Sequence, residues 1–191
     1  MPHLATNHEI ETYTGRYVDT SMPDPATICL EDIAHALANT CRFGGHCGVF
    51  YSVAEHAVSV ATKLVDQGYG ALALAGLHHD DAEAYLGDIP RPLKPLLGDA
   101  YRDLTNRMDA AIAEAFGDLW SVADLSAQPV RWADEWMLGV EALSLLPSHG
   151  EGWAAFQTPW RVLGPLPLGW SPTEAEWEFI QRHHSIVQAW A

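Results

Sequence analysis

The chain has 191 residues, enough for one domain with a sizeable core, and its 48% hydrophobic and 18% charged residues are typical of a globular protein rather than a disordered one. Acidic residues number 25 against 10 lysines and arginines, and the resulting net charge of -15 argues against binding to nucleic acids or anionic membranes. No apolar run could span a bilayer and no secretory leader is recognisable, so we expect one cytoplasmic domain over residues 1–191 with its three cysteines reduced.

The N-terminal third of the chain is predicted to pass from an irregular lead-in to helices. A short strand or hairpin is expected around Thr12–Val18. Apolar residues at helical spacing predict a first helix over Asp32–Cys41, which a Gly-Gly turn ends. Ser52 followed three residues later by Glu55 is the pattern of a capping box, and it predicts a second helix that extends to about Gln67.

The remaining elements are also predicted to be helical. A helix that is apolar on nearly all sides for its first two turns is expected over 70–85, and prolines then break the pattern. Further helices are predicted over Tyr101–Phe116 and Val130–Leu146. The Trp- and Pro-rich segment 153–170 is expected to be irregular, and Ser-Pro-Thr-Glu at 171–174 begins a final helix. The predicted fold is therefore an all-α bundle.

The densest polar cluster in the sequence interrupts the most apolar predicted helix. It consists of His78-His79-Asp80-Asp81 followed by Glu83. Buried charges of this kind are costly unless something compensates them, and a bound cation is a common solution. On a continuous helix His79, Asp80 and Glu83 would share one face, because they lie three and four residues apart. A lone histidine on an apolar face is more often an ordinary core residue, so the spacing by itself leaves both interpretations open.

Two residues from other predicted helices could complete a metal site. His56 lies among apolar residues of the second helix, and Asp134 lies similarly in the helix over 130–146. Together with His79 and Asp80 they make a mixed imidazole and carboxylate set. Such a set suits Co, Mn, Zn, Fe or Ni and leaves open positions for water.

The order His56, then His79-Asp80, then Asp134 resembles the ligand pattern of the HD-domain metal-dependent phosphohydrolases. Three longer motifs extend this resemblance over most of the chain: CRFGGH at 41–46, YSVAEH at 51–56 and AEAYLGDIP at 82–90. These motifs are similar to a bacterial and phage subgroup that contains 5′-deoxynucleotidases and deoxynucleoside triphosphate triphosphohydrolases. Phage members of the subgroup remove dATP where 2-aminoadenine is written into the viral DNA.

The resemblance implies an HD-domain helical fold and hydrolysis of a deoxynucleoside triphosphate, with dATP favoured, to deoxynucleoside and triphosphate. It implies that the four residues named above ligate the metal and that Arg42, Asp80 and Glu83 serve catalysis. It also implies that Arg42, Lys94 and Arg131 bind phosphates. From the residues alone, Lys94 in a proline-stiffened loop and Arg131 near a metal ligand are conspicuous cations in an acidic chain, and His46 beside the Gly-Gly turn is a weaker phosphate candidate.

One departure and two alternatives accompany this interpretation. Asp81 stands where relatives carry a small residue, and with His78 it leaves room for a second divalent ion beside the phosphates. The chain could instead be a 5′-deoxynucleotidase for monophosphates, which needs fewer cations, or a non-catalytic nucleotide-binding module. In each case the expected partner is a small deoxynucleotide. Eight tryptophans, an apolar C-terminal helix and the resemblance favour a homo-oligomer, a dimer or a hexamer, which would reside in the host cytoplasm if a phage encodes it.

Overall fold

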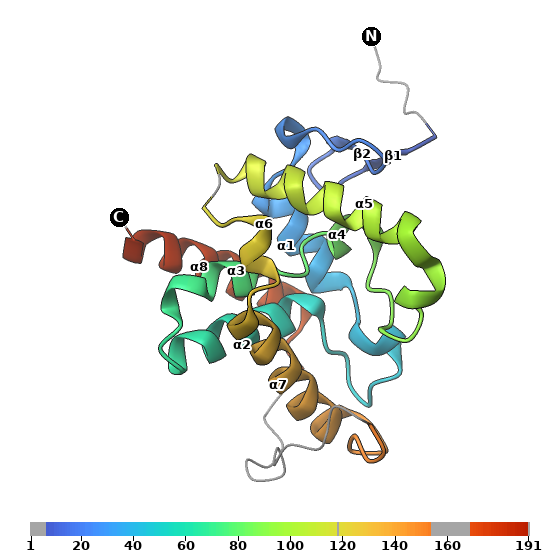
Figure 1. Ribbon diagram of the computed structural model, residues 1–191, viewed down its shortest axis with the longest axis vertical. Helices are drawn as coiled ribbons and strands as arrows, with labels where there is room; N and C mark the ends of the chain where they lie inside the picture. The colour runs from blue at the N-terminus through green and yellow to red at the C-terminus, as the bar shows by residue number, and fades with distance from the viewer. Residues whose placement is uncertain (1–6, 118, 154–168, 191) are drawn as a thin grey trace.

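The computed structural model describes residues 7–117, 119–153 and 169–190. As predicted, the chain is mostly helical, and a short hairpin precedes the helices (Figure 1). The hairpin pairs β1 (Glu9–Glu11) antiparallel with β2 (Tyr17–Asp19). The helices are α1 (Leu30–Asn39), α2 (Val53–Asp66), α3 (Ala73–Leu77), α4 (Glu83–Leu86), α5 (Lys94–Ala115), α6 (Val122–Leu125), α7 (Gln128–Leu145) and α8 (Pro172–Trp190), with short 3-10 turns at Pro25–Thr27, Arg42–Gly45 and Gly70–Leu72.

Helix α2 lies at the centre of the bundle, where it contacts α1, α3, α7 and α8 (Figure 1). Most of its residues are buried, and many of these are alanine or valine, whose small side chains let the neighbouring helices approach closely. The tightest approach is at Gly76 of α3, where an added Cβ atom would collide with the Leu64 side chain of α2. His56 belongs to this buried helix, and its side chain is therefore held in the interior.

Only half of the capping box predicted at the start of α2 is present. The Ser52 hydroxyl accepts a hydrogen bond from the backbone N–H of Glu55 at 3.1 Å, as expected. The Glu55 carboxylate does not return this bond but accepts the N–H groups of Gly169 and Trp170 at 2.9 and 2.8 Å. The carboxylate thereby ties the segment before α8 to the central helix, a tertiary use that local spacing does not predict.

The single helix predicted over 70–85 is wrong, because the chain leaves the helical path between α3 and α4. The side chain of His79 donates its Nδ1–H to the carbonyl of Gly76 at 2.8 Å. In a continuous helix that carbonyl would accept the backbone N–H of Asp80 instead. The next backbone hydrogen bonds join residues three apart rather than four, from Glu83 N to Asp80 O and from Ala84 N to Asp81 O. His78 to Ala82 therefore form turns that separate two short helices.

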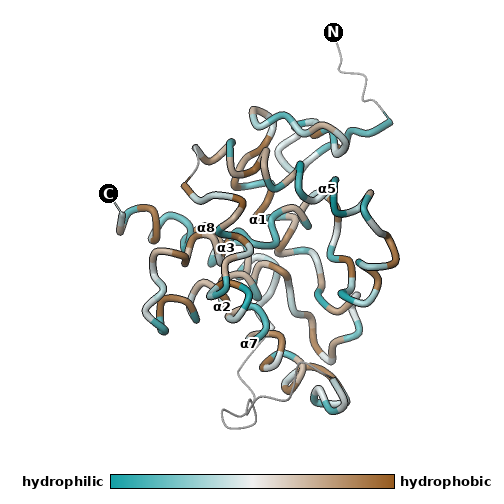
Figure 2. Tube along the Cα trace, viewed as in Figure 1, coloured by the Kyte–Doolittle hydropathy of each residue, from teal (hydrophilic) through white to brown (hydrophobic). Residues whose placement is uncertain are grey.

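The other predicted helices are present with shifted boundaries. The helix predicted over 101–116 begins earlier, at Lys94, and is kinked at Gly98, whose φ of 70° is unfavourable for other residues. Figure 2 shows frequent polar residues along this helix, α5, most of whose residues are exposed or half-buried. Most of the Trp- and Pro-rich segment, residues 154–168, lies outside the described residues. Each described helix is too short or too polar to cross a membrane.

The N-terminal hairpin is anchored to the bundle by one buried carboxylate. Asp32 of α1 accepts hydrogen bonds from Thr12 Oγ1 at 2.8 Å, from Thr14 N at 2.7 Å and from Thr14 Oγ1 at 2.9 Å. The thiol of Cys29 donates a fourth, at 3.1 Å. Burial raises the pKa of Asp32, but these hydrogen bonds outweigh it and lower the pKa below its ordinary value.

We predict that Asp32→Ala lowers the free energy of unfolding by about 2–3 kcal/mol, because it leaves the Thr14 N–H, two threonine hydroxyls and the Cys29 thiol without their charged acceptor. Urea unfolding followed by circular dichroism would measure this loss. The matched control is Asp103→Ala, which removes an exposed carboxylate of α5 and should change the stability by less than about 0.5 kcal/mol. Equal stability of the two variants would refute the anchoring role of Asp32.

Candidate metal centre

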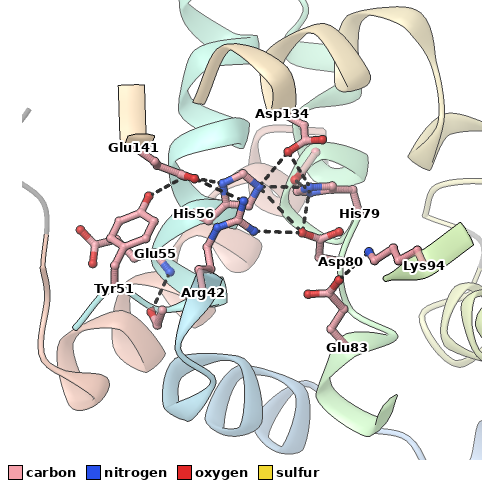
Figure 3. A network of polar contacts seen from close by, with 12 residues as sticks. Arg42, Tyr51, Glu55, His56, His79, Asp80, Glu83, Lys94, Asp134 and Glu141 are labelled. Atoms are coloured by element: carbon pink, nitrogen blue, oxygen red, sulfur yellow. Dashed lines mark hydrogen bonds and ion pairs between the residues drawn. The ribbon is translucent and has the colours of Figure 1, made fainter. Parts of the chain in front are cut away.

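Three segments that are distant in the sequence bring the four predicted metal ligands together (Figure 3). His56 comes from α2, His79 and Asp80 from the turns after α3, and Asp134 from α7. His56 Nε2 lies 3.3 Å from His79 Nε2 and 3.2 Å from Asp134 Oδ1. Asp80 Oδ2 lies 3.2 Å from His79 Nε2 and 3.8 Å from His56 Nε2. The four side chains therefore converge on one point.

The chemistry of this donor set fits a cation. His79 uses its Nδ1–H to bind the Gly76 carbonyl, and Nδ1 of His56 lies against the carboxylate of Glu141. With hydrogens on both Nδ1 atoms, the Nε2 lone pairs face each other and the two aspartate oxygens. Such a group consists of acceptors alone, and either protons or a metal must balance it. The ligand atoms of His56, His79 and Asp134 lie within 4.8 Å of one another, so this buried group could hold a metal ion.

The protonation of the metal-free cluster shows the same imbalance. Burial lowers the pKa of His79, but the adjacent carboxylate of Asp80 raises it more, to about 10. The pKa of Asp80 itself is held well below its usual range, against the effect of burial, by His79, His56 and Arg42. Burial likewise raises the pKa of Asp134, yet its contacts with His56 bring it down to about 2. Both carboxylates therefore stay ionised and attract positive charge to this point.

Arg42 is the cation that lies against the cluster. It occupies the 3-10 turn between α1 and α2, and its backbone N–H donates to Tyr51 O at 2.9 Å. The next residue, Phe43, has a φ of 57° and lies in the left-handed region, which non-glycine residues seldom adopt. The Arg42 guanidinium is buried, with Nη1 3.6 Å from Asp80 Oδ2. Its Nε–H is buried without a hydrogen-bond partner among the described residues.

Glu83 and Lys94 form an ion pair beside the ligands (Figure 3). Lys94 Nζ donates to Glu83 Oε1 at 3.1 Å, while Glu83 Oε2 is buried without a hydrogen-bond partner among the described residues. The single helix face predicted for His79, Asp80 and Glu83 is wrong, because turns separate α3 from α4. Lys94 likewise begins α5 rather than lying in a loop. Burial, followed by the charge of Asp80, raises the pKa of Glu83 to about 8.

Two other predicted phosphate ligands lie outside this network. Arg131 is exposed on α7, one turn before Asp134, and its side chain forms no hydrogen bond or ion pair with the described residues. His46 is exposed at the end of the Gly-Gly turn, where a Cβ on Gly44 would contact both His46 and Pro90. The structure thus brings Arg42 against Asp80 of the cluster and pairs Lys94 with the neighbouring Glu83, whereas Arg131 and His46 form no such ion pair within the described residues.

Three residues of the site were not predicted as functional from the sequence: Glu141, Tyr51 and Asp88. Glu141 lies on α7 and contacts His56, Arg42 and the hydroxyl of Tyr51. Its position seven residues after Asp134 places it on the same helix face, a signal that spacing alone could have provided. Asp88 is the third. Burial raises its pKa, which the charges of Arg42, Asp80 and Lys94 also influence.

His78 and Asp81 belong to a second buried cluster. His78 Nδ1 lies 2.5 Å from Asp81 Oδ2, and its Nε2 lies 2.8 Å from Nδ1 of His183 on α8. The imidazole of His78 also stacks on Trp120, with a centroid distance of 4.3 Å. His78 therefore has no nitrogen left for the second divalent ion predicted here. Its contacts instead link α8 to the turn that contains Asp80.

The adjacent residues Asp80 and Asp81 provide a matched test of these two clusters. We predict that Asp80→Asn weakens Mn²⁺ binding at least about 100-fold, because loss of a ligand should exceed the roughly 10- to 100-fold effect of losing a residue that supports one. Asp81→Asn should keep the metal affinity but lower the free energy of unfolding by about 1–3 kcal/mol, since it removes the charged partner of His78. Titration calorimetry and urea unfolding measure the two effects, and the reverse pattern would contradict the assignment.

Comparisons with known proteins place this chain among two relatives of nearly equal length. No family model matches it. It is 35% identical over 181 residues to "Uncharacterized protein YfdR" of Escherichia coli (strain K12), covering 94% of this chain and 96% of that protein. It is 33% identical over 184 residues to "Uncharacterized protein RCAP_rcc00048" of Rhodobacter capsulatus, covering 92% and 94%. The chain therefore belongs to the protein family that includes Escherichia coli YfdR.

Proposed function

We propose that this protein is a metal-dependent phosphohydrolase of the HD type that acts on deoxynucleotides. The observation that carries the proposal is the convergence of His56, His79, Asp80 and Asp134 beside the buried guanidinium of Arg42. Two imidazoles and two carboxylates can hold a divalent metal with positions left for substrate and water. A cation beside such a centre suits a substrate with a phosphate group.

The proposed reaction is attack of water on the α-phosphorus. When bound at these four ligands, a divalent metal would polarise a phosphoryl oxygen and make water a better nucleophile. The new bond joins the water oxygen to phosphorus, and the bond between phosphorus and the 5′ oxygen breaks. The water gives up a proton and the 5′ oxygen takes one, so the products are a deoxynucleoside and inorganic phosphate or triphosphate.

Arg42 is placed to bind the phosphoryl group under attack. Its guanidinium is held between Asp80 and Glu141, and Nε–H remains free of partners among the described residues. A fixed cation in a site that excludes water stabilises the negative charge that develops on the phosphoryl oxygens and needs no rearrangement to do so. In this proposal Arg42 therefore contacts the substrate throughout the reaction.

Glu83 is the candidate for accepting the proton of the attacking water. Lys94 holds one carboxylate oxygen, and the other is buried and free of hydrogen bonds from the described residues. A general base works best when its pKa lies near the pH of the reaction, and burial beside Asp80 raises the pKa of Glu83 to about 8. Lys94 would act through Glu83 by orienting it.

We predict that Glu83→Gln lowers kcat about 10²- to 10⁴-fold while metal binding is retained, because a proton acceptor is lost but no ligand is. A coupled phosphate assay and Mn²⁺ calorimetry on the same preparation would measure both. Glu114→Gln removes an exposed carboxylate from α5 and serves as the control of unchanged rate. Full activity of Glu83→Gln would remove Glu83 from the mechanism.

The number of phosphates on the substrate is the finer part of the proposal. The sequence resemblance favours dATP, whose two outer phosphates need cations of their own. In the structure Lys94 is already paired with Glu83, and Arg131 is the exposed cation one turn from Asp134. These observations also favour a second candidate, a 5′-deoxynucleotidase that acts on dAMP, because Arg42 by itself could serve a single phosphate.

Substitution of Arg131 can distinguish dATP from dAMP as the substrate. With Mn²⁺ and H₂¹⁸O, we predict that dATP yields deoxyadenosine and triphosphate, with the label in the triphosphate. Arg131→Ala should raise KM for dATP about 10- to 100-fold, equivalent to loss of one charged hydrogen bond, and leave KM for dAMP unchanged. Arg107→Ala, an exposed arginine of α5, is the matched control. Hydrolysis of dAMP alone would establish the nucleotidase, and no turnover of any deoxynucleotide with metal would favour a binding module.

A further inference from the structure

Glu141 is a fully buried carboxylate that touches three other side chains of the site. Its side chain is 0% exposed and lies on α7, two turns after Asp134. Oε1 lies 2.5 Å from His56 Nδ1 and accepts the hydroxyl of Tyr51 at 3.0 Å. Oε2 lies 3.2 Å from Arg42 Nη2. One carboxylate thus joins a candidate metal ligand to the cation that lies against the cluster (Figure 3).

The contact with His56 decides which ring nitrogen can bind a metal. An ionised carboxylate only accepts hydrogen bonds, so the hydrogen of His56 must lie on Nδ1. The lone pair of Nε2 then points at His79, Asp80 and Asp134. Carboxylates that bind the far nitrogen of a metal-ligating histidine fix its orientation and raise its basicity.

The other imidazole is oriented in a different way. His79 donates its Nδ1–H to the carbonyl oxygen of Gly76, which is a neutral acceptor in the backbone. No side-chain substitution removes that acceptor. His56 depends on a charged side chain, and this makes its orientation accessible to mutation.

The charge of Glu141 is balanced within the same group of residues. Burial raises its pKa, but Arg42 and His56 outweigh this effect and lower the pKa below the ordinary value. The hydroxyl of Tyr51 supplies a further hydrogen bond to Oε1. Among the ion pairs of the described residues, removal of the carboxylate would leave Arg42 with the longer contact to Asp80. Glu141 is therefore needed both for the direction of His56 Nε2 and for the position of the guanidinium.

We propose that Glu141 is the positioning residue of this metal centre: it holds His56 with Nε2 toward the ion and couples that ligand to Arg42. The proposal rests on the metal centre of the proposed function and on no particular nucleotide. Glu141 is not one of the four candidate ligands, so its effect passes through His56 and Arg42.

The first test measures metal affinity with the full chain. Titration calorimetry of the metal-free protein with Mn²⁺ should give a Kd for Glu141→Gln about 10- to 100-fold above that of the wild type. Glu135→Gln makes the same change on an exposed side chain of α7 and should leave the Kd unchanged. Tyr51→Phe keeps the carboxylate on His56 and should have a smaller effect than Glu141→Gln. A wild-type Kd for a folded Glu141→Gln protein would overturn the proposal.

The second test observes the histidine directly, and its decisive measurement is made on the wild type. The Zn²⁺-loaded wild type, labelled with ¹⁵N-histidine, should show the His56 hydrogen on Nδ1, with its resonance assigned by its loss in His56→Asn. In Glu141→Gln this proton should resonate further upfield and exchange faster with water, and Glu141→Asp should restore part of the wild-type behaviour. A hydrogen on Nε2 of His56 in the wild type would overturn the proposal even if Glu141→Gln failed to fold.

Both measurements are made without nucleotide, so they separate this inference from the proposed function. Normal Mn²⁺ binding and the expected His56 resonance in a protein that hydrolyses no deoxynucleotide would refute the hydrolytic function and support the role of Glu141. Failure of the wild type to bind any divalent metal would overturn both.

Discussion

Negative charge crowded into the interior is the constraint on which this structure depends. Asp80, Asp134, Glu83 and Glu141 lie within one network with few positive partners, in a medium where charges interact far more strongly than in water. A buried carboxylate persists only if it is paired and hydrogen-bonded. Arg42 and Lys94 provide part of the balance, and the two imidazoles, either protonated or bound to a cation, provide the rest.

This balance explains why the helix is interrupted where the polar residues begin. On a regular helix the side chains of His79 and Asp80 would point in directions about 100° apart. The bond from the His79 side chain to the Gly76 carbonyl replaces a helical hydrogen bond and starts a series of turns. Those turns bring His79 Nε2 within 3.2 Å of Asp80 Oδ2 and let Glu83 begin a new helix. The irregular backbone is therefore part of the candidate site.

The second cluster supports the same turns from behind. His78 is held by Asp81 within the turns and by His183 from α8, and aromatic rings of Phe116, Trp120 and Phe179 surround it. His79 and Asp80 thus face the candidate metal centre, whereas the residues on either side of them, His78 and Asp81, face the core. The strongly acidic surface has little bearing on either cluster, because a small anion responds to the local field around Arg42 and Lys94.

The sequence by itself determined which segments are helical and which four residues are candidate ligands. Apolar periodicity, caps such as Ser171 with Glu174, and breaks at proline or glycine are local signals, and most of the helices they predict are present within a few residues, although α5 begins well before its predicted start. Local signals could not show that the Glu55 carboxylate accepts the N–H groups of Gly169 and Trp170 instead of completing a capping box. Nor could they show that the predicted helix over 70–85 is interrupted. Both depend on partners outside the helix.

The tertiary structure decided which charges meet. Arg42, Lys94 and Arg131 were equivalent candidates in the sequence, yet within the described residues Arg42 lies against Asp80 and Lys94 pairs with Glu83, while Arg131 is exposed, because a cation's partners depend on how distant segments pack. Spacing could place Glu141 on the same helix face as Asp134, but only the packing of α7 against α2 shows that its carboxylate contacts His56. Sequence spacing and the family resemblance therefore supplied the candidate ligands, whereas packing between helices decided which residues orient and balance them.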